Sequence, residues 1–248
     1  MRETKILYLY PDILDLYGDI GNIKVLKYRL EKRGISVIVD TYSIDNPAPN
    51  FSAYDIVFSG GGADNEQQIL AEDLIKYKEQ IKEAVSNGVF FLLICGSYQL
   101  FGQYYKGVEG NIIQGLEIFD YYTEAIEDRK KRCIGNIVIE TMINGKETKV
   151  IGFENHGGQT FNIEEPFGSV LYGNGNKFGD LNEGYMSKNV IATYLHGPLL
   201  SKNPDIADYI IKYALERKYD EKIELEELDD EFEKKCREQL LKKFIENI

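Results

Sequence analysis

Cys95 is the residue of this chain whose setting most favours covalent chemistry. It directly follows the apolar run Val89–Ile94 and directly precedes Gly96. A thiol on a tight turn between a buried strand and a helix is held out from the sheet, and glycine tolerates the crowded backbone there. This setting favours a nucleophilic cysteine. The alternative is a buried structural cysteine, which is the commoner role of a lone cysteine.

His196 is the best candidate for the base that would activate this thiol. It lies just past the apolar run Val190–Tyr194 and is one of only two histidines in the 248 residues. If the two strands are parallel neighbours, their carboxyl ends place the imidazole opposite the thiol. In such a pair the histidine removes the thiol proton and later protonates a leaving amine. On its own, His196 could equally be a turn histidine positioned by Gly197 and Pro198.

The segment Ser59–Asp64 (SGGGAD) offers a set of backbone donors. It follows the strand-like run Asp55–Phe58. Backbone N–H groups of such a loop can be aimed at an oxyanion or a phosphate. No Gly-Lys-Ser/Thr sequence closes it, so it is not a P-loop. With the N–H of Gly96 as a second donor, the loop is a candidate half of an oxyanion hole, and a plain tight turn is the alternative.

Alternating strand-like and helix-like segments must position these residues. In the first half of the chain, short apolar runs alternate with segments of helical periodicity, the longest of which covers Glu66–Ser86. This alternation predicts an α/β fold with a central, mostly parallel sheet flanked by helices. The middle of the chain changes to short strand-like runs between Gly/Asn turns, which predict a small antiparallel extension: Gly107–Phe119, Ile134–Met142, Lys149–Phe153 and Ser169–Tyr172.

The last part of the chain is highly charged and carries one apolar helical stripe. We predict one domain over residues 1–219 and a charged helical extension of the same domain over residues 220–248. Within the extension, Leu240, Leu241, Phe244 and Ile245 share one face of a helix. That stripe could dock either on this domain or on a partner.

The composition narrows the function classes. With 41 acidic against 29 basic residues, the formal net charge is −12, which argues against a general nucleic-acid binder. No apolar run reaches the roughly 18 residues of a membrane-spanning helix. The three cysteines (Cys95, Cys133 and Cys236) are widely spaced and form no C-x-x-C pair. We therefore expect no disulfide framework, no metal site and a reducing, cytoplasmic location.

The motifs together resemble the class I glutamine amidotransferases, which have a flavodoxin-like fold. The resemblance rests on three glycines after one strand, Cys95-Gly-x-x-Gln99 after the next, and His196 after a late strand. It implies that Cys95 attacks the side-chain amide of glutamine and that His196 is the general acid/base. It implies further that the N–H groups of Gly61 and Gly96 form the oxyanion hole and that Gln99 lines the glutamine pocket.

The usual third member of the family's catalytic triad is missing. Most members carry a glutamate two residues after the histidine, where this chain has Pro198. The histidine still needs a group that fixes its tautomer and stabilises its cation. Three sources remain open, namely Asp19, Asp64 or an acid of a partner subunit.

Longer motifs narrow the resemblance to the cobyric-acid-synthase-like branch, which also lacks that glutamate. The motifs are Leu16–Asn22 (LYGDIGN), Gly61–Asp64 (GGAD), Gly152–Thr160 (GFENHGGQT) and Tyr194–Pro198 (YLHGP). Within the branch they resemble the glutaminase subunits of bacterial lipid II isoglutaminyl synthase. That resemblance implies hydrolysis of L-glutamine through a cysteine thioester, without a cofactor in this chain. A MurT-like Mur-ligase subunit would use the ammonia, with ATP and Mg²⁺, to amidate the D-glutamate α-carboxyl of the lipid II stem peptide.

The same resemblance places a glutamine-binding arginine at Arg132, which opens the run Cys133–Ile139. A guanidinium can hold an α-carboxylate through two parallel hydrogen bonds. The neighbouring Arg129–Lys131 allow a plain solvated basic turn instead. His156 could touch the substrate, and a structural turn histidine is the alternative.

Three classes of function fit these residues. The favoured one is an amidotransferase subunit that passes ammonia to a partner, for lipid II or for a cobyric-acid-type acceptor. The second is a free-standing, cysteine-dependent γ-glutamyl amide hydrolase. The third is a binding subunit that keeps the fold without chemistry, and the presence of Cys95, His196 and the Gly-rich loop at compatible strand ends disfavours it.

Overall fold

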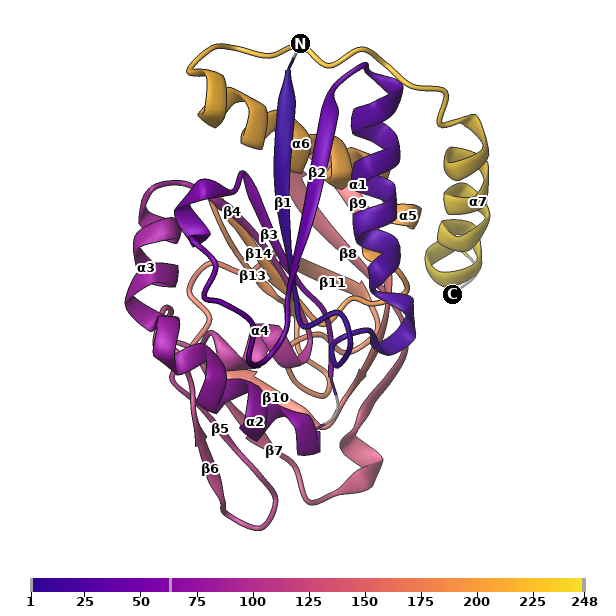
Figure 1. The fold of residues 1–248 in the computed structure, drawn as a ribbon. Coiled ribbons are helices and arrows are strands. Elements are labelled where there is room, and N and C mark those ends of the chain that lie inside the picture. The colour runs from indigo at the N-terminus through magenta and orange to yellow at the C-terminus, as the bar shows by residue number, and fades with distance from the viewer. Residues whose placement is uncertain (1, 63, 247–248) are drawn as a thin grey trace.

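A six-stranded sheet forms the centre of the fold in the computed structural model, which describes residues 2–62 and 64–246 (Figure 1). The strand order is β13-β14-β4-β3-β1-β2, and all neighbours are parallel except β13 and β14. The parallel strands run in the spatial order typical of flavodoxin-like folds. The strands are β1 (Glu3–Leu9), β2 (Ser36–Tyr42), β3 (Ile56–Ser59), β4 (Phe90–Ile94), β13 (Tyr185–Ser187) and β14 (Val190–Thr193).

The middle of this sheet is the hydrophobic core. Strands β3, β4 and β14 are buried over their whole length. Parallel strands that are covered on both faces carry continuous apolar runs, which is why these segments show no alternation of polar and apolar residues. Because β1, β3, β4 and β14 are parallel, the segments that follow them meet at one edge of the sheet.

Helices cover both faces of the central sheet. In Figure 1, α1 and α6 lie on one side of the sheet, whereas α2 and α3 lie on the other. The helices that connect or follow the parallel strands are α1 (Ile20–Lys32), α2 (Asp64–Leu74), α3 (Lys78–Ser86), α4 (Gly96–Leu100), α5 (Leu199–Lys202) and α6 (Pro204–Tyr219). Short 3-10 turns occupy Leu16–Gly18, Phe51–Ala53, Ile75–Tyr77 and Arg129–Lys131.

The prediction of one helix over Glu66–Ser86 is wrong in one respect. The helix is interrupted at Ile75–Tyr77, and Tyr77 leaves the helical region with φ −111° and ψ 8°. The Tyr77 ring packs edge-on against Tyr42 and also contacts Phe51, and its hydroxyl bonds to that of Tyr42. These tertiary contacts divide a segment whose local periodicity is continuous.

Two four-stranded sheets form the extension predicted for the middle of the chain, and they are antiparallel except where β5 pairs in parallel with β7. One has the order β10-β7-β5-β6 and the other β12-β11-β8-β9. The expected α/β class with a mostly parallel central sheet is confirmed. The predicted strand Gly107–Phe119 is reduced to β6, because a turn from Gly107 to Gly110 precedes it. The strands are β5 (Tyr104–Lys106), β6 (Ile112–Gln114), β7 (Tyr122–Ala125), β8 (Cys133–Ile143), β9 (Lys146–His156), β10 (Gly158–Phe161), β11 (Gly168–Tyr172) and β12 (Asn182–Glu183).

The apolar stripe of the C-terminal extension docks on this domain. The extension forms α7 (Glu231–Leu241) and a π-helical turn over Lys242–Glu246. Phe244 is buried against Val138 and Ile151 of the β8–β9 hairpin, and its ring stacks on Tyr172. Among the described residues, every helix is too short or too polar to span a lipid bilayer.

A buried ion-pair network fastens the extension to the helical layer. The Arg29 guanidinium donates to both oxygens of Asp208 and to both oxygens of Asp230, at 2.6 to 2.9 Å. Only 4% of the Arg29 side chain is exposed. These paired bonds join α1, α6 and the residue that precedes α7, so loss of Arg29 would leave Asp230 without this cation, whereas Asp208 would keep its pairing with Arg33.

Candidate active site

Cys95 occupies a strained turn between β4 and α4. Its backbone has φ 52° and ψ −105°, and a left-handed backbone of this kind costs a non-glycine residue about 1–3 kcal/mol. The turn is held by a hydrogen bond from Cys95 N to Thr193 O of β14 and by one from Gln99 N to Cys95 O. Buried neighbours on both sides therefore fix this strained conformation, which holds the thiol at the end of the strand.

His196 and Cys95 flank the backbone of Gly61. A Cβ atom built on Gly61 would lie 2.5 Å from His196 Cε1 and 3.3 Å from the Cys95 Cβ. Any side chain at this position would therefore collide with the imidazole. The structure brings together the thiol, the imidazole and the glycine loop that the sequence places after three different strands.

His196 Nδ1 faces the buried carboxylate of Asp19. The Nδ1 atom lies 3.1 Å from Asp19 Oδ2 and 3.4 Å from Oδ1, and neither side chain is exposed to solvent. The other ring nitrogen, Nε2, has no hydrogen-bond partner among the described residues. Asp19 thus occupies the position of a triad acid, and Nε2 is left for the thiol or a leaving group. The side chain of Asp64, the other candidate in this chain, lies outside the described residues.

Three successive contacts place Asp19 against His196. Besides the Asp19–His196 pair, Asn22 Oδ1 accepts a hydrogen bond from Leu200 N at 2.9 Å. Between these two, a Cβ on Gly21 would lie 2.1 Å from Pro198 Cγ. The start of α1 therefore docks closely on the segment that follows β14, with Pro198 packed against Gly21 where most class I members carry a glutamate.

The electrostatics of the site favour a charged imidazole. Burial by itself opposes the imidazolium, but the negative charges of Cys95 and Asp19 outweigh it and hold the pKa of His196 well above its usual value. A protonated histidine in this position can deliver a proton to a leaving amine.

The glycine loop is fixed to the cysteine turn by two serines. Ser97 Oγ donates to Gly60 O at 2.6 Å, and the Ser59 hydroxyl bonds to Ser97 Oγ at the same distance. The N–H of Gly61 donates to Asp19 Oδ2 at 2.9 Å. A substrate oxyanion would therefore compete with Asp19 for this N–H, and the role of Gly61 and Gly96 as oxyanion donors stays a prediction.

Gln99 lies on the buried face of α4 behind the cysteine. Its Oε1 accepts from Gln67 Nε2 at 2.7 Å, and its Nε2 donates to the Tyr194 hydroxyl at 3.1 Å. A Cβ on Gly158 would come within 2.5 Å of the same Nε2. The Gln99 amide is thus engaged with protein groups on both sides, which suits a residue that shapes a pocket wall.

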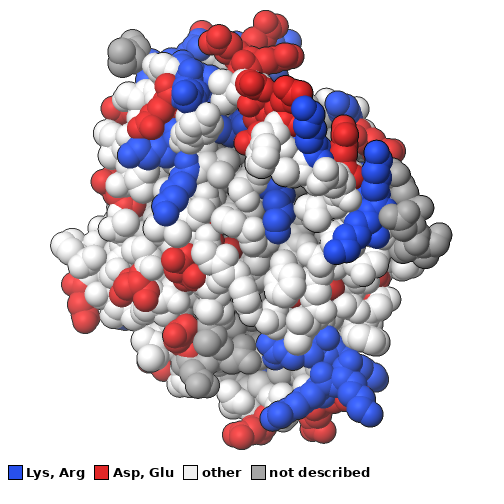
Figure 2. All heavy atoms as spheres, turned by 90° about the vertical axis from the view of Figure 1, so that its right-hand side faces the viewer, with Lys and Arg blue, Asp and Glu red and all other residues white. Residues whose placement is uncertain are grey.

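Arg132 is exposed at the start of β8, at the end of a basic turn. Figure 2 draws the side of the molecule that carries α7, and Lys and Arg side chains gather in a patch at the lower edge of this face. The turn Arg129–Lys131 itself is exposed to solvent. Arg132 Nη2 donates to Asn155 Oδ1 at 3.2 Å, and its Nη1 lies 2.8 Å from where a Cβ on Gly157 would be.

Two tyrosines complete the site, and sequence reasoning did not single them out. The Tyr17 ring packs edge-on against His196 at 4.9 Å, and its hydroxyl meets the Asn155 amide that Arg132 also contacts. A chain of contacts therefore leads from Arg132 to the imidazole. Tyr17 has a positive φ of 59° within the LYGDIGN motif, and this motif is the only signal that could have identified it.

Tyr194 lies under the site together with His156. The Tyr194 hydroxyl bonds to Gln99 and to Thr160, and its ring stacks on the His156 imidazole with centroids 3.6 Å apart. His156 is buried, and this burial lowers its pKa to about 3, so the imidazole is neutral. His156 lies in the interior at the end of β9, and whether it touches the substrate or is a structural histidine stays open.

The comparisons with known proteins place this geometry in a family. The chain belongs to the CobB/CobQ-like glutamine amidotransferase domain family, whose model matches residues 5–204. Among curated proteins, the lipid II isoglutaminyl synthase (glutamine-hydrolyzing) subunit GatD of Staphylococcus aureus is 41% identical over 241 residues. That match covers 97% of this chain and 96% of the relative. The subunit GatD of Streptococcus pneumoniae is 41% identical over 230 residues, covering 92% of this chain and 86% of the relative.

More distant relatives share the fold. A probable cobyric acid synthase of Methanococcus vannielii is 31% identical over 149 residues, which cover 56% of this chain and 29% of that protein. The structure of PurLQS from Thermotoga maritima aligns with a TM-score of 0.55 at 14% identity, covering 89% of this chain and 100% of the matched chain. The resemblance drawn from the motifs is thus confirmed at the level of the family and of its GatD relatives.

Proposed function

We propose that this chain is the glutaminase subunit of a cytoplasmic lipid II isoglutaminyl synthase. It hydrolyses L-glutamine to glutamate and ammonia, and a MurT-like partner uses the ammonia to amidate the D-glutamate α-carboxyl of the lipid II stem peptide. The observation that carries the proposal is the 41% identity with two GatD subunits along nearly the whole chain. The convergence of Cys95, His196 and Asp19 at one sheet edge supplies the matching chemistry.

The reaction follows from the position of each group. Arg132 pairs with the α-carboxylate of glutamine, and the Gln99 side of the pocket receives the carboxamide. His196 Nε2 takes the thiol proton of Cys95, and the thiolate attacks the amide carbon. The N–H groups of Gly96 and Gly61 stabilise the oxyanion that forms.

Ammonia leaves in the next step, and water completes the cycle. The C–N bond breaks as His196 returns the proton to nitrogen, which leaves a γ-glutamyl thioester on Cys95 and free ammonia. A water molecule then gives a proton to His196 and attacks the thioester carbon. Collapse of this second intermediate breaks the C–S bond, releases glutamate and restores the thiol.

The amidation itself belongs to the partner. Forming an amide from a carboxylate and ammonia requires activation of the carboxyl, which an ATP- and Mg²⁺-dependent ligase supplies by phosphorylation. We assign ATP, Mg²⁺ and lipid II to the MurT-like subunit, and no cofactor to this chain. The 31% identity to a probable cobyric acid synthase covers only 56% of this chain, so a cobyric-acid-type acceptor is the weaker alternative.

The test is a coupled assay on the chain expressed with and without its Mur-ligase-like partner. Release of glutamate from glutamine and amidation of lipid II are measured in parallel. Cys95→Ala should abolish both with glutamine, whereas ammonium chloride should restore amidation, because only the ammonia supply is lost. Cys236→Ala is the matched control, since this thiol is exposed on α7 and should leave both activities unchanged.

Three results would contradict the proposal. Full glutamine hydrolysis by the chain alone, with no complex formed, would favour a free-standing γ-glutamyl amide hydrolase. Amidation of a cobyric-acid-type acceptor instead of lipid II would move the chain to another pathway. A Cys95→Ala protein that no longer folds would identify Cys95 as a packing residue of the core.

A further inference from the structure

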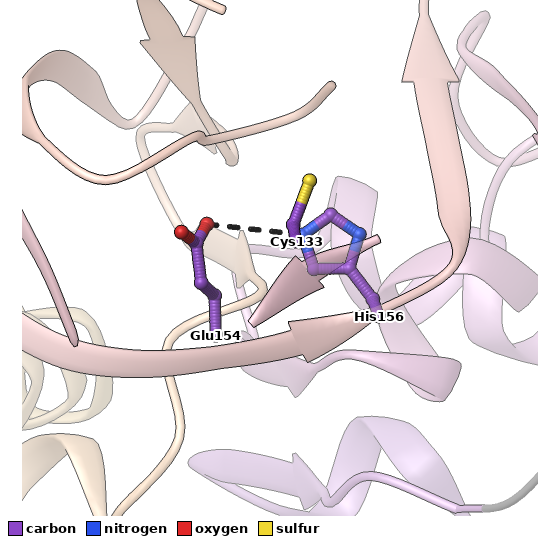
Figure 3. A group of neighbouring side chains, drawn as sticks. All are labelled: Cys133, Glu154 and His156. Atoms are coloured by element: carbon purple, nitrogen blue, oxygen red, sulfur yellow. Dashed lines mark ion pairs between the residues drawn. The ribbon is translucent and has the colours of Figure 1, made fainter. Parts of the chain in front are cut away.

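Three metal-ligating side chains meet in the interior where β8 and β9 pair. Cys133 lies directly opposite His156 in the antiparallel register, and Glu154 is two residues before His156 on the same face of the strand. Cross-strand partners and residues two apart on one face are neighbours in any sheet. Their ligand atoms (the Cys133 Sγ, a Glu154 oxygen and a His156 ring nitrogen) all lie within 4.8 Å of one another (Figure 3).

The tautomer of His156 leaves a lone pair inside this cluster. Nδ1 lies 2.7 Å from Gly158 O, and because a carbonyl oxygen only accepts, Nδ1 must carry the hydrogen. Nε2 is then a bare acceptor, and it has no hydrogen-bond partner among the described residues, although 99% of the side chain is buried. A metal-ligating histidine characteristically donates its other ring N–H to a carbonyl or carboxylate in this way.

A carboxylate oxygen, which is also an electron donor, lies near this lone pair. Glu154 Oε2 lies 4.0 Å from His156 Nε2, which is too far for a hydrogen bond. Figure 3 shows the carboxylate and the imidazole on the same side of β9, with the Cys133 thiol beside them. In this dry interior the lone pair, the carboxylate and the sulfur are available to one cation, and Cys133 would release its thiol proton on binding it.

A second set of groups orients the cluster. Glu154 Oε1 accepts from Asn174 N and Nδ2 at 2.8 and 2.9 Å, and Oε2 accepts from Gly175 N at 3.0 Å. The Gln159 amide donates to Cys133 Sγ at 3.8 Å. Hydrogen bonds of this kind orient the side chains that bind metal ions and moderate their charge. The donors to Glu154 come from the segment that joins β11 to β12.

We propose that Cys133, Glu154 and His156 supply three of the four ligands of a buried structural zinc ion. A thiolate and a carboxylate carry two negative charges, which a divalent cation neutralises, and the neutral imidazole adds a third ligand. Sulfur and imidazole ligands favour Zn²⁺ over Mg²⁺ or Ca²⁺. Zinc bonds of about 2.0–2.3 Å require the cluster to contract around the ion. The expectation of no metal rested on the absence of a C-x-x-C motif, and a cross-strand site needs no such motif.

The ion would brace side chains that contact Gln99. The His156 ring stacks on Tyr194, whose hydroxyl bonds to Gln99, so an ion on Nε2 would fix the ring against which Tyr194 packs. It would also fasten the segment with Asn174 and Gly175 to β9. The proposal concerns structure, so it stands or falls independently of glutamine hydrolysis.

The test uses the untagged full chain expressed in medium supplemented with Zn²⁺ or with Co²⁺. Metal content is measured by mass spectrometry, and X-ray absorption on the wild-type zinc protein reports the ligand atoms. The cobalt protein reports a bound thiolate through its sulfur-to-metal charge-transfer band. All variants are made in a Cys95→Ser background, so that the catalytic thiol cannot supply the sulfur. Cys133→Ser is compared with the matched exposed control, Cys236→Ser.

We expect stoichiometric zinc with one sulfur ligand and a cobalt charge-transfer band. Cys133→Ser should abolish the band and lower the zinc content at least tenfold, whereas Cys236→Ser should change neither. Wild-type protein without stoichiometric zinc would overturn the proposal, as would a zinc shell without sulfur. A cobalt band that survives Cys133→Ser, or one that disappears with Cys95→Ser alone, would place the ion elsewhere. The wild-type measurements decide the question even if Cys133→Ser does not fold.

Discussion

The change Asp19→Asn tests the proposed triad with the smallest change in shape. Asp19 is fully buried, and its Oδ2 lies 3.1 Å from His196 Nδ1 and 2.9 Å from Gly61 N. The amide preserves the volume and one acceptor oxygen but removes the negative charge. It also introduces an N–H₂ group that can face Nδ1, in which case the imidazole adopts the wrong tautomer.

The expected loss follows from these contacts. A hydrogen bond to a charged group contributes about 1.5–3 kcal/mol, which corresponds to a loss of roughly 10- to 150-fold in kcat/KM if only this bond weakens. If the tautomer also inverts, the loss rises towards the ~10⁴-fold seen when the acid of a Ser–His–Asp triad becomes an amide. We therefore expect Asp19→Asn to reduce glutamine hydrolysis by about 10- to 10⁴-fold, with less effect on KM than on kcat.

The pH profile of glutamine hydrolysis separates this role from a structural one. The negative charges of Cys95 and Asp19 together raise the pKa of His196. With Asp19 neutral, the imidazolium is less stabilised, so its pKa falls. The alkaline limb of the rate profile, where His196 can no longer protonate ammonia, should therefore move to lower pH. A merely destabilised protein would lose activity with an unchanged profile.

Two controls make the result decisive. Asp40→Asn removes an exposed carboxylate that accepts a hydrogen bond from the Tyr54 hydroxyl, so it should leave the rate and the profile unchanged. Asp64→Asn tests the other acid of this chain. Full activity and an unmoved profile in Asp19→Asn, measured in the complex, would refute the triad as described here. If the same held for Asp64→Asn, the acid would have to come from the partner.

Three further predictions concern substrate binding and stability. Arg132→Lys should raise the KM for glutamine at least tenfold with little change in kcat, whereas Arg129→Lys should change neither in steady-state assays. Burial raises the pKa of Glu183 to about 8, so the free energy of unfolding should fall between pH 4.5 and 8. In urea titrations, Glu183→Gln should make the free energy of unfolding less dependent on pH. Above pH 8 it should stabilise the protein by at most about 5 kcal/mol. Phe244→Ala should cost about 3 kcal/mol in the same titrations, and Phe232→Ala, at a 76% exposed position, almost nothing.

The parallel sheet was predictable because its strands are buried on both faces. A continuous apolar run such as Val89–Ile94 is typical of a strand that is buried on both faces of a sheet. The helical segments between such runs connect neighbouring strands in parallel. The break at Ile75–Tyr77 was not predictable, since it depends on how Tyr77 packs against Tyr42 and Phe51. The docking of Phe244 on the β8–β9 hairpin likewise depends on tertiary contact.

Part of the candidate site could likewise be predicted from the sequence, whereas the rest depends on tertiary contacts. Cys95 and His196 could be identified because each follows an apolar strand, and parallel strands deliver their carboxyl ends to one edge. Asp19 could be named only as one of three acids, because it lies 177 residues from His196. Its selection depends on the docking of α1 through Gly21 and Asn22. The cluster around Cys133 depends on the register of β8 and β9, which no residue spacing along the chain encodes.

Asp19 also links the general base to the oxyanion loop. A single oxygen, Oδ2, accepts from both His196 Nδ1 and Gly61 N. In the imidazolium form of His196, the bond to Asp19 is an ion pair and is strengthened. The shared carboxylate charge is then drawn towards the imidazolium, so its hold on the Gly61 N–H is weaker. We infer that the charge of His196 and the availability of the Gly61 donor are coupled through one atom, so removing the charge of Asp19 should impair proton transfer by His196 while leaving the Gly61 N–H easier to release.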